Sequence, residues 1–292
     1  MKMPPFAYHR PETVDEAVGL LAGHGGDGKV LAGGQSLIPL LAMRLAHPAH
    51  LIDIGFVGEL GSVTEEADGG LLVGAAVRHA DAETSEVVAE RAPLVAGAMP
   101  HIGHRAIRNR GTVCGSLAHA DPAAELPAVA LAVEAEMVVR GPSGERRVAA
   151  ADFFQGYLTS DLAEDDLLAA VRFPAWPAHT GWSVQEMSRR HGDFAVVGVA
   201  TVLGCNLDGE ISRAALSFFG AGSTPMRVAE AESAMVGQRP GPAAFEAAAR
   251  IVSENLKPPG DNHASGAYRA HVAGVLTQRS LAEAASRTGV TA

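Results

Sequence analysis

The chain has 292 residues, a formal net charge of -10 and two cysteines. An acidic chain is not expected to bind duplex nucleic acid, and two cysteines can supply neither a disulfide framework nor the four ligands of a [2Fe–2S] cluster. No apolar run approaches about 18 residues and residues 1–6 contain no signal region, so we expect a cytoplasmic protein without a membrane span. None of the 12 histidines lies in an H-E-x-x-H or similar frame. We therefore expect no metal site, and any redox chemistry would need a bound organic cofactor.

The first fifty residues predict a compact α/β unit. Thr13 followed by Glu16 is typical of a capping box at the start of a helix over residues 13–22. A short apolar strand at residues 30–32 leads through a glycine pair into a second helix, and residues 51–54 form another short buried strand. This alternation of helix and strand favours an α/β fold.

The remaining sequence predicts a mixed central part and a final α+β part. Helices are expected at residues 81–90, 93–107 and 125–131, a hairpin around 136–146, and a strand at 167–173 closed by Pro174. Residues 174–177, Pro-Ala-Trp-Pro, are the best linker candidate. Three strands and then three helices follow, which indicates α+β architecture. The strands are expected at 183–188, 195–205 and 211–219, and the helices at 227–236, 242–255 and 268–287.

The stretch Val30-Leu-Ala-Gly-Gly-Gln-Ser36 is the first candidate binding site. Gly33 and Gly34 remove two Cβ atoms between a strand and a helix, so several backbone N–H groups can point at one anion such as a phosphate. The spacing matches neither a dinucleotide-binding G-x-G-x-x-G motif nor a Walker P-loop. An ordinary strand-to-helix turn remains the alternative for this stretch taken alone.

A second glycine-containing stretch, residues 111–116, repeats this pattern in the sequence Gly-Thr-Val-Cys-Gly-Ser. Asp121 and Glu125 follow it, and each could accept hydrogen bonds from sugar or ribityl hydroxyls. Capping of the next helix by Asp121, ahead of Pro122, is an equally good explanation of that aspartate. His104, Arg105 and Arg108 precede the stretch, and we expect them to form a solvated basic helix face. Two such stretches in separate units favour a diphosphate cofactor that bridges them.

Three motifs together resemble the FAD-binding medium subunit of molybdenum hydroxylases, a family that includes carbon monoxide dehydrogenase, quinoline oxidoreductase and the flavin domain of xanthine dehydrogenase. They are Ala32–Ser36, Thr112–Pro122 and Arg189–Phe194, and the resemblance covers nearly the whole chain. It implies a two-part FAD-binding domain of the vanillyl-alcohol oxidase type, followed by a C-terminal α+β domain with a small antiparallel sheet. The implied boundaries are residues 1–56, 57–175 and 176–292.

The resemblance also implies which residues contact FAD. The first loop would wrap the diphosphate, the second loop would form the other diphosphate and ribityl wall, and two apolar side chains would pack on the adenine or ring region. Phe194 stands where relatives often carry Tyr beside the flavin ring. Relatives usually have glycine where this chain has Cys114, which is the one departure from the family's pattern in this motif. The implied cofactor-binding residues are Leu31, Ala32, Gly33, Gly34, Gln35, Ser36, Leu37, Ile107, Gly111, Thr112, Cys114, Gly115, Ser116, Ala118, Asp121, Glu125, Leu168 and Phe194.

The function implied is that of an electron-transfer subunit with FAD as its cofactor and no catalytic acid or base of its own. Electrons would come from [2Fe–2S] clusters in a small partner subunit, the molybdenum cofactor would lie in a large partner subunit, and the assembly would be a dimer of heterotrimers. A stand-alone FAD-dependent oxidase or dehydrogenase of a small organic substrate is the alternative. A small-molecule-binding module without a redox role is a weaker one.

Overall fold

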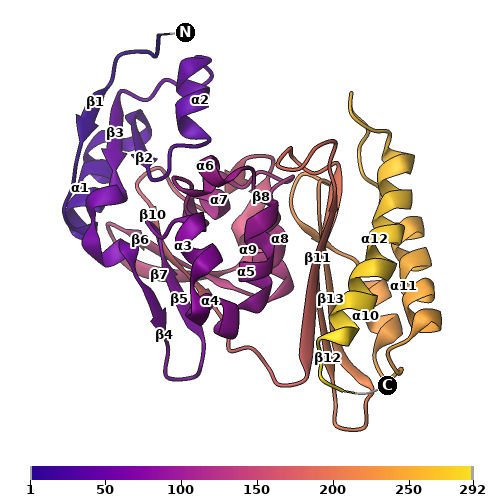
Figure 1. Ribbon diagram of the computed structural model, residues 1–292. Helices are drawn as coiled ribbons and strands as arrows, with labels where there is room; N and C mark the ends of the chain where they lie inside the picture. The colour runs from indigo at the N-terminus through magenta and orange to yellow at the C-terminus, as the bar shows by residue number, and fades with distance from the viewer. Residues whose placement is uncertain (1, 291–292) are drawn as a thin grey trace.

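The computed structural model describes residues 2–290, and its strands form three main sheets that follow one another along the chain (Figure 1). The architecture is mixed α/β, as the sequence predicts. The N-terminal sheet is parallel, whereas the central and C-terminal sheets are antiparallel.

The N-terminal sheet has the strand order β1-β3-β2. Helix α1 begins as predicted, because the Thr13 hydroxyl accepts a hydrogen bond from the Glu16 N–H group at 3.1 Å, and its apolar face is buried. Since the strands are parallel, the loops that follow β2 and β3 leave from the same edge of the sheet. The elements are β1 (Ala7–His9), α1 (Val14–His24), β2 (Gly28–Leu31), α2 (Leu37–Ala42) and β3 (His50–Asp53), with short 3-10 helices η1 (Gly25–Asp27), η2 (Ile54–Phe56) and η3 (Gly58–Gly61).

The central sheet has the order β4-β5-β10-β6-β7. Its middle strand, β10 (Leu167–Phe173), is buried at every position except Arg172, which explains its almost wholly apolar sequence. The predicted hairpin is β6 (Glu136–Gly141) with β7 (Gly144–Ala149). The other elements of this part are β4 (Val63–Glu65), β5 (Leu71–Gly74), α7 (Val113–His119), α8 (Glu125–Ala132), α9 (Ala150–Phe153) and the two-stranded ribbon β8 (Phe154–Gly156) with β9 (Thr159–Ser160).

Two predicted helices of the central part are broken in the structure. The segment 81–90 divides into α3 (His79–Thr84) and α4 (Glu86–Arg91), because the Ser85 hydroxyl caps a new helix by accepting from the Val88 N–H group at 3.3 Å. The segment 93–107 divides into three short pieces, and the second break comes where Gly103 takes a left-handed φ of 50°. These pieces are α5 (Pro93–Ala98), η4 (Met99–His101) and α6 (Arg105–Arg108).

The C-terminal sheet, β11-β12-β13-β14, lies between two layers of helices (Figure 1). Helices α5 and α8 pack on one face, and α12 packs on the other, with α11 and α10 beside it. Strand β12 is buried at every position, as expected for a strand covered on both faces. The elements are β11 (Thr180–Met187), β12 (Val197–Cys205), β13 (Ile211–Phe219), β14 (Met226–Arg227), α10 (Ala229–Met235), α11 (Pro242–Asn255) and α12 (Gly266–Ser286).

Candidate functional site

The first glycine loop, residues 32–36, connects the end of β2 to the start of α2. Gly34 has a left-handed φ of 72°, and its carbonyl oxygen accepts the Ile38 N–H group at 2.9 Å, which starts the helix. Within residues 2–290, the backbone N–H groups of Gly33, Gly34, Gln35 and Ser36 have no hydrogen-bond acceptor. The loop therefore presents several free donors from one short stretch of backbone, which suits an anion.

The second glycine loop, residues 111–116, is held by a short pairing with residues 77–79. The His79 N–H group donates to the Gly111 carbonyl at 2.9 Å, and the Val113 N–H group donates to the Val77 carbonyl at 3.1 Å. Helix α7 then begins with Thr112 as its cap, whose hydroxyl accepts from the Gly115 N–H group at 3.0 Å. The loop is therefore rigidly placed by backbone bonds and by its own cap.

The two glycine loops are in direct contact. A Cβ atom on Gly33 would lie 2.3 Å from the carbonyl oxygen of Arg110 and 2.6 Å from the Cα of Gly111, so no side chain fits there. On the second loop, a Cβ atom on Gly115 would lie 4.0 Å from the Cβ of Ala32. The free N–H groups of the first loop thus lie directly against the second loop, where Thr112 and Cys114 are the residues of 111–116 whose N–H groups have no acceptor among the described residues. A diphosphate requires this kind of cradle, because its oxygens need several donors without intervening side chains.

Arg78 reinforces the junction, and no sequence motif points to this residue. Its guanidinium donates to the carbonyl oxygen of Arg110, the same atom that Gly33 approaches. Burial, helped by the charge of Arg110, lowers the pKa of Arg78 from its ordinary value, but an arginine remains charged. The Arg78 charge favours an anionic ligand at the junction, although the nearby carboxylates of Asp53 and Asp81 partly balance it.

His79 lies directly beneath the second loop. A Cβ atom on Gly111 would lie 2.8 Å from the His79 Nδ1 atom, so the imidazole ring supports a position that only glycine can occupy. Neither ring nitrogen has a hydrogen-bond partner among the described residues. Burial lowers the pKa of His79 to about 4, so the ring is neutral at neutral pH. Like Arg78, it lies outside any recognisable motif.

The Cys114 side chain points away from the glycine loop. Its thiol is buried and lies 3.6 Å from the carbonyl oxygen of Val73 in β5. Burial raises the pKa of this thiol far above its ordinary value, so it is not a nucleophile. The departure from glycine at this position therefore leaves the exposed face of the loop unchanged, and a covalent bond to a ligand there has no structural support.

Asp121 and Glu125 occupy different environments. The Asp121 carboxylate accepts the Ala123 N–H group at 2.9 Å, but α8 begins only at Glu125 with Ala124 as its cap, so Asp121 closes the preceding turn and does not cap the helix. Glu125 is buried, and this burial raises its pKa to about 7. The negative charge of Glu186 acts in the same direction. Glu186 itself pairs with His101, at 3.5 Å between the Nδ1 and Oε1 atoms.

The basic residues before the second loop do not form the solvated face that the sequence predicts. Arg108 is buried and makes a bidentate ion pair with Glu83, at 2.8 and 3.1 Å. It also donates to the carbonyl oxygens of Ile102 and Gly103, so it holds the break between η4 and α6 in place. His104 and Arg105 are exposed, as expected. A buried arginine requires a partner carboxylate, and the sequence did not show that Glu83 would supply it.

The remaining predicted residues are distributed over three elements. Ile107 lies against the second loop, because its carbonyl oxygen accepts the Gly111 N–H group at 2.8 Å. Leu168 is buried in β10 within the central core, whereas Phe194 is 71% exposed in the loop after β11. That loop approaches the central part, since a Cβ atom on Gly192 would lie 2.6 Å from the His104 ring. Ser116 and Ala118 lie half-buried along α7, and Leu31 and Leu37 flank the first loop.

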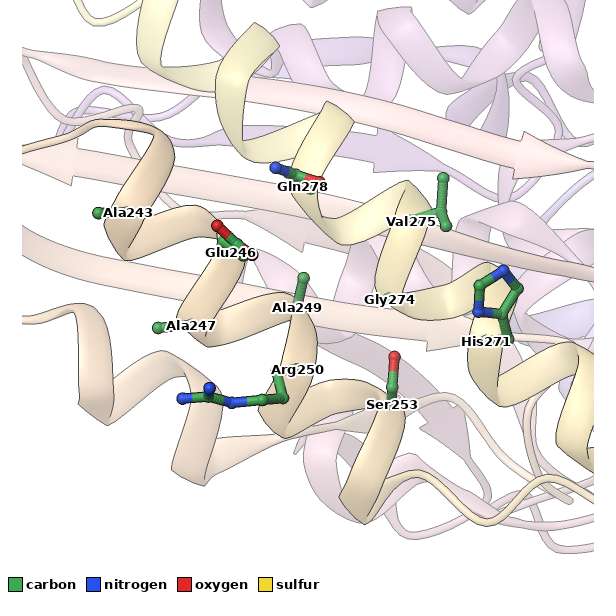
Figure 2. Close-up of a pocket in the computed structure, with 10 residues that line it drawn as sticks. All are labelled: Ala243, Glu246, Ala247, Ala249, Arg250, Ser253, His271, Gly274, Val275 and Gln278. Atoms are coloured by element: carbon green, nitrogen blue, oxygen red, sulfur yellow. The ribbon is translucent and has the colours of Figure 1, made fainter.

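A surface groove of about 600 Å³ lies elsewhere, between α11 and α12 (Figure 2). Small residues let these helices approach closely there, since a Cβ atom on Gly274 would lie 2.0 Å from the Ser253 hydroxyl. The groove contains none of the predicted cofactor-binding residues, and its helices lie on the opposite side of the molecule from α2 (Figure 1). It is a groove between packed helices and contributes nothing to the candidate site.

Comparison with known proteins identifies the family. Residues 4–176 match the FAD-binding domain in molybdopterin dehydrogenase, and residues 182–284 match the C-terminal domain of CO dehydrogenase flavoprotein. The chain belongs to the FAD-binding medium subunits of the molybdenum hydroxylases. It is 38% identical to the 6-hydroxypseudooxynicotine dehydrogenase complex subunit alpha of Paenarthrobacter nicotinovorans, over 98% of this chain and 97% of that one.

Solved structures agree with this assignment. A chain of carbon monoxide dehydrogenase from Hydrogenophaga pseudoflava superposes with a TM-score of 0.94 at 38% identity, covering 98% of this chain and 99% of that one. A chain of quinoline 2-oxidoreductase from Pseudomonas putida 86 superposes with a TM-score of 0.94 at 36% identity, covering 99% of this chain and 100% of that one. This medium subunit is therefore an oxidoreductase subunit with FAD as its cofactor, as the sequence motifs imply. Within residues 2–290, no helix has both the length and the apolarity needed to cross a membrane.

Proposed function

We propose that this chain transfers electrons within a heteromeric molybdenum hydroxylase. Electrons would enter from [2Fe–2S] clusters of a small partner subunit and leave to an external acceptor. The chain contains two cysteines, Cys114 and Cys205, both buried, so it cannot ligate such clusters itself. The relatives carry names such as complex subunit and medium chain, which supports a partner-dependent role.

The contact between the two glycine loops is the observation that carries the proposal. We infer that the FAD diphosphate binds to the free N–H groups of Gly33–Ser36 and to the backbone of Gly111–Ser116, with Leu31 and Leu37 flanking the first loop. The positive charge of Arg78, anchored on Arg110, would add to the attraction of these donors. The first loop fits a diphosphate because it offers four consecutive backbone N–H groups with no acceptor among the described residues.

Other residues near the two glycine loops would contact the remaining parts of the cofactor. Ile107 and the backbone around Leu168 would contact the adenine or ring region, and Ala118, Asp121 and Glu125 would lie towards the ribityl or adenosine part. Phe194 would pack on the flavin ring, because a large aromatic side chain that is 71% exposed in the chain gains burial when a ring covers it. It could stack, but it has no hydroxyl with which to donate a hydrogen bond.

The chain's own residues would bind, orient and shield the cofactor. When bound, FAD supplies a centre that exchanges electrons singly or in pairs. The rigid second loop, fixed by Thr112 and by its pairing with residues 77–79, would set the position of the diphosphate. No side chain is assigned as a general acid or base, because electron transfer requires none.

We also propose the division into residues 1–56, 57–175 and 176–292, of which residues 1 and 291–292 lie outside the described part. Each range contains one of the three main sheets. The partners would be a large molybdenum-containing subunit and a small iron–sulfur subunit, assembled as a dimer of heterotrimers. Relatives of similar identity are named for carbon monoxide and for caffeine, so the similarity of this chain does not indicate the substrate, which we expect to bind in the large subunit.

Electron transfer can be tested without knowing the substrate. The FAD-loaded chain would be mixed, without oxygen, with the small cysteine-rich subunit whose clusters have been reduced by dithionite and freed of excess reductant. We expect the visible absorbance of the flavin to bleach while the electron paramagnetic resonance signal of the reduced clusters disappears. Reduced clusters that leave the flavin oxidised would contradict the proposal. Bleaching of the isolated chain by a small organic substrate alone would instead favour the stand-alone oxidase or dehydrogenase.

A further inference from the structure

Three histidines from three elements converge on the N-terminal sheet. They are His9 at the end of β1, His24 at the end of α1 and His50 at the start of β3. One ring nitrogen from each lies within 4.8 Å of the others, and all three side chains are half-buried. The His9 Nε2 and His50 Nδ1 atoms are 2.9 Å apart, and the His24 and His50 rings are stacked with centroids 3.6 Å apart.

The fold brings these rings together through the register of β1 against β3 and through the absence of a side chain at Gly28. His50 pairs with Ala7, and His9 pairs with Ile52, so His9 and His50 lie on the same face of the parallel sheet, two residues apart in register. His24 continues the buried face of α1 one turn beyond Leu21. Gly28 lies opposite His50 in β2, and a Cβ atom there would come within 3.4 Å of the His24 Cβ.

We propose that His9, His24 and His50 bind one divalent transition-metal ion of the zinc, cobalt, nickel or copper type. Neutral imidazole is a preferred ligand of these ions, and three protein ligands with a water in the fourth position form a complete tetrahedral site. With metal–nitrogen distances of about 2.0–2.1 Å, tetrahedral nitrogens lie about 3.3–3.4 Å apart. Since the ligand nitrogens lie within 4.8 Å of one another, the His24 ring must tilt out of its stacked position and move closer to meet this geometry. The ion would replace the His9–His50 hydrogen bond.

Two further features favour a cation at this place. His24 is the last residue of an eleven-residue helix, whose terminal carbonyl groups create a negative potential. An ion bound by residues of β1, α1 and β3 would also hold these three elements together. It would lie at the opposite end of the sheet from the first glycine loop, because His50 begins β3 whereas Leu31 ends β2. The proposal runs against the sequence-based expectation of a metal-free chain. The spacing of residues 9, 24 and 50 matches no known metal-binding frame, and only the fold brings them together.

The test uses the full chain without a histidine tag, loaded with FAD. Equilibrium dialysis against Zn²⁺ should give one tightly bound ion per chain, and Co²⁺ should give the intense visible bands of a tetrahedral complex. His24→Gln and His9→Gln should each weaken binding by about 100-fold or more, since even outer partners of metal ligands are worth about 10–100-fold. His263→Gln is the matched control, because His263 is exposed and lies outside the cluster, and it should leave binding unchanged.

Circular dichroism and flavin absorbance would show whether each variant is folded. Anomalous diffraction from crystals of the unaltered chain soaked in Zn²⁺ provides a measurement that requires no variant, and it should place the ion among the three rings. The proposal is overturned if the chain binds no ion, if the ion lies elsewhere, or if folded His24→Gln and His9→Gln chains bind as tightly as the original.

Discussion

Gly33 packs against the backbone at Gly111 so closely that a single added methyl group would stand 2.6 Å from the Gly111 Cα atom. Gly33 lies in the loop after β2 and Gly111 in the loop between α6 and α7, so their contact joins the N-terminal part of the chain to the central part. Because the free N–H groups of the first loop lie at this junction, occupancy of the cofactor site and the joining of the two parts should be linked.

The Gly33→Ala substitution tests this contact. The added Cβ must displace the Arg110 carbonyl, which we expect to cost about 1–3 kcal/mol of stability and to weaken FAD binding by about tenfold or more. Fluorescence titration with FAD and urea unfolding would measure the two effects. Gly23→Ala in α1 is the control, because its Cβ would meet nothing within 4 Å, and it should bind FAD normally. Normal FAD binding by Gly33→Ala would show that the loops need not touch.

Arg78→Met removes the charge and the donor that hold the Arg110 carbonyl. Removing a positive charge beside the proposed diphosphate site should lower FAD affinity by about tenfold, and this loss should shrink as salt is raised. Arg105→Met removes an exposed arginine nearby and should have little effect. Equal losses in the two variants would mean that only overall charge matters.

His79 should make the chain less stable in acid. Its pKa is about 4 in the folded chain and near 6.5 when unfolded, so the unfolded state binds the proton first and stability falls as the pH drops from about 6.5 to 4. The full effect is on the order of 3 kcal/mol. In His79→Leu, the free energy of unfolding, measured in urea, should change less with pH over this range. An unchanged slope in His79→Leu would show that the ring is already protonated or exposed.

Glu125 should have the opposite effect over an overlapping range. Its pKa is raised from about 4.5 to about 7 in the folded chain, so the folded state holds the proton more tightly and stability falls as the pH rises from about 4.5 to 7. Because His79 and Glu125 oppose each other, the profile of the unaltered chain can look flat, and single variants are needed. Glu125→Gln keeps the shape without the charge, and at pH 8 it should be more stable by up to about 3 kcal/mol. Lower stability of this variant at pH 8 would indicate that the ionised carboxylate is paired.

Phe194 should affect the binding and fluorescence of FAD but not the stability of the fold. Because this side chain is 71% exposed, Phe194→Ala should change stability by less than about 0.5 kcal/mol, while the fluorescence and affinity of bound FAD change. Leu207→Ala, at 87% exposed in the turn before β13, serves as the control and should change neither. Unaltered flavin fluorescence in Phe194→Ala would place the ring elsewhere.

Local sequence signals predicted those features that depend on local chemistry. The Thr13 cap, the glycine pair at 33–34 and the apolar run at 167–173 each lie in the structure where the sequence places them. Each of these signals depends only on residues close to it in the sequence, so it can be interpreted without knowing the fold.

Features that depend on contacts between distant segments could not be predicted. The roles of Arg78 and His79 depend on the pairing of residues 77–79 with 111–113, for which the sequence has no marker. The sequence predicts a solvated face for Arg108, because nothing near it in the chain marks Glu83, in a different helix, as its partner. The cluster of His9, His24 and His50 likewise exists only through strand register.

The central claim is that one FAD diphosphate binds both glycine loops at once. Hydrogen exchange of the chain, measured by mass spectrometry with and without FAD, tests it most directly, because the N–H groups of Gly33–Ser36 have no acceptor within the described residues. We predict that residues 32–36 become protected at the same FAD concentration as the Thr112 and Cys114 N–H groups, which are the ones in the second loop without an acceptor among the described residues. Saturation with FAD that protects only one of the two loops, or neither, would contradict the account.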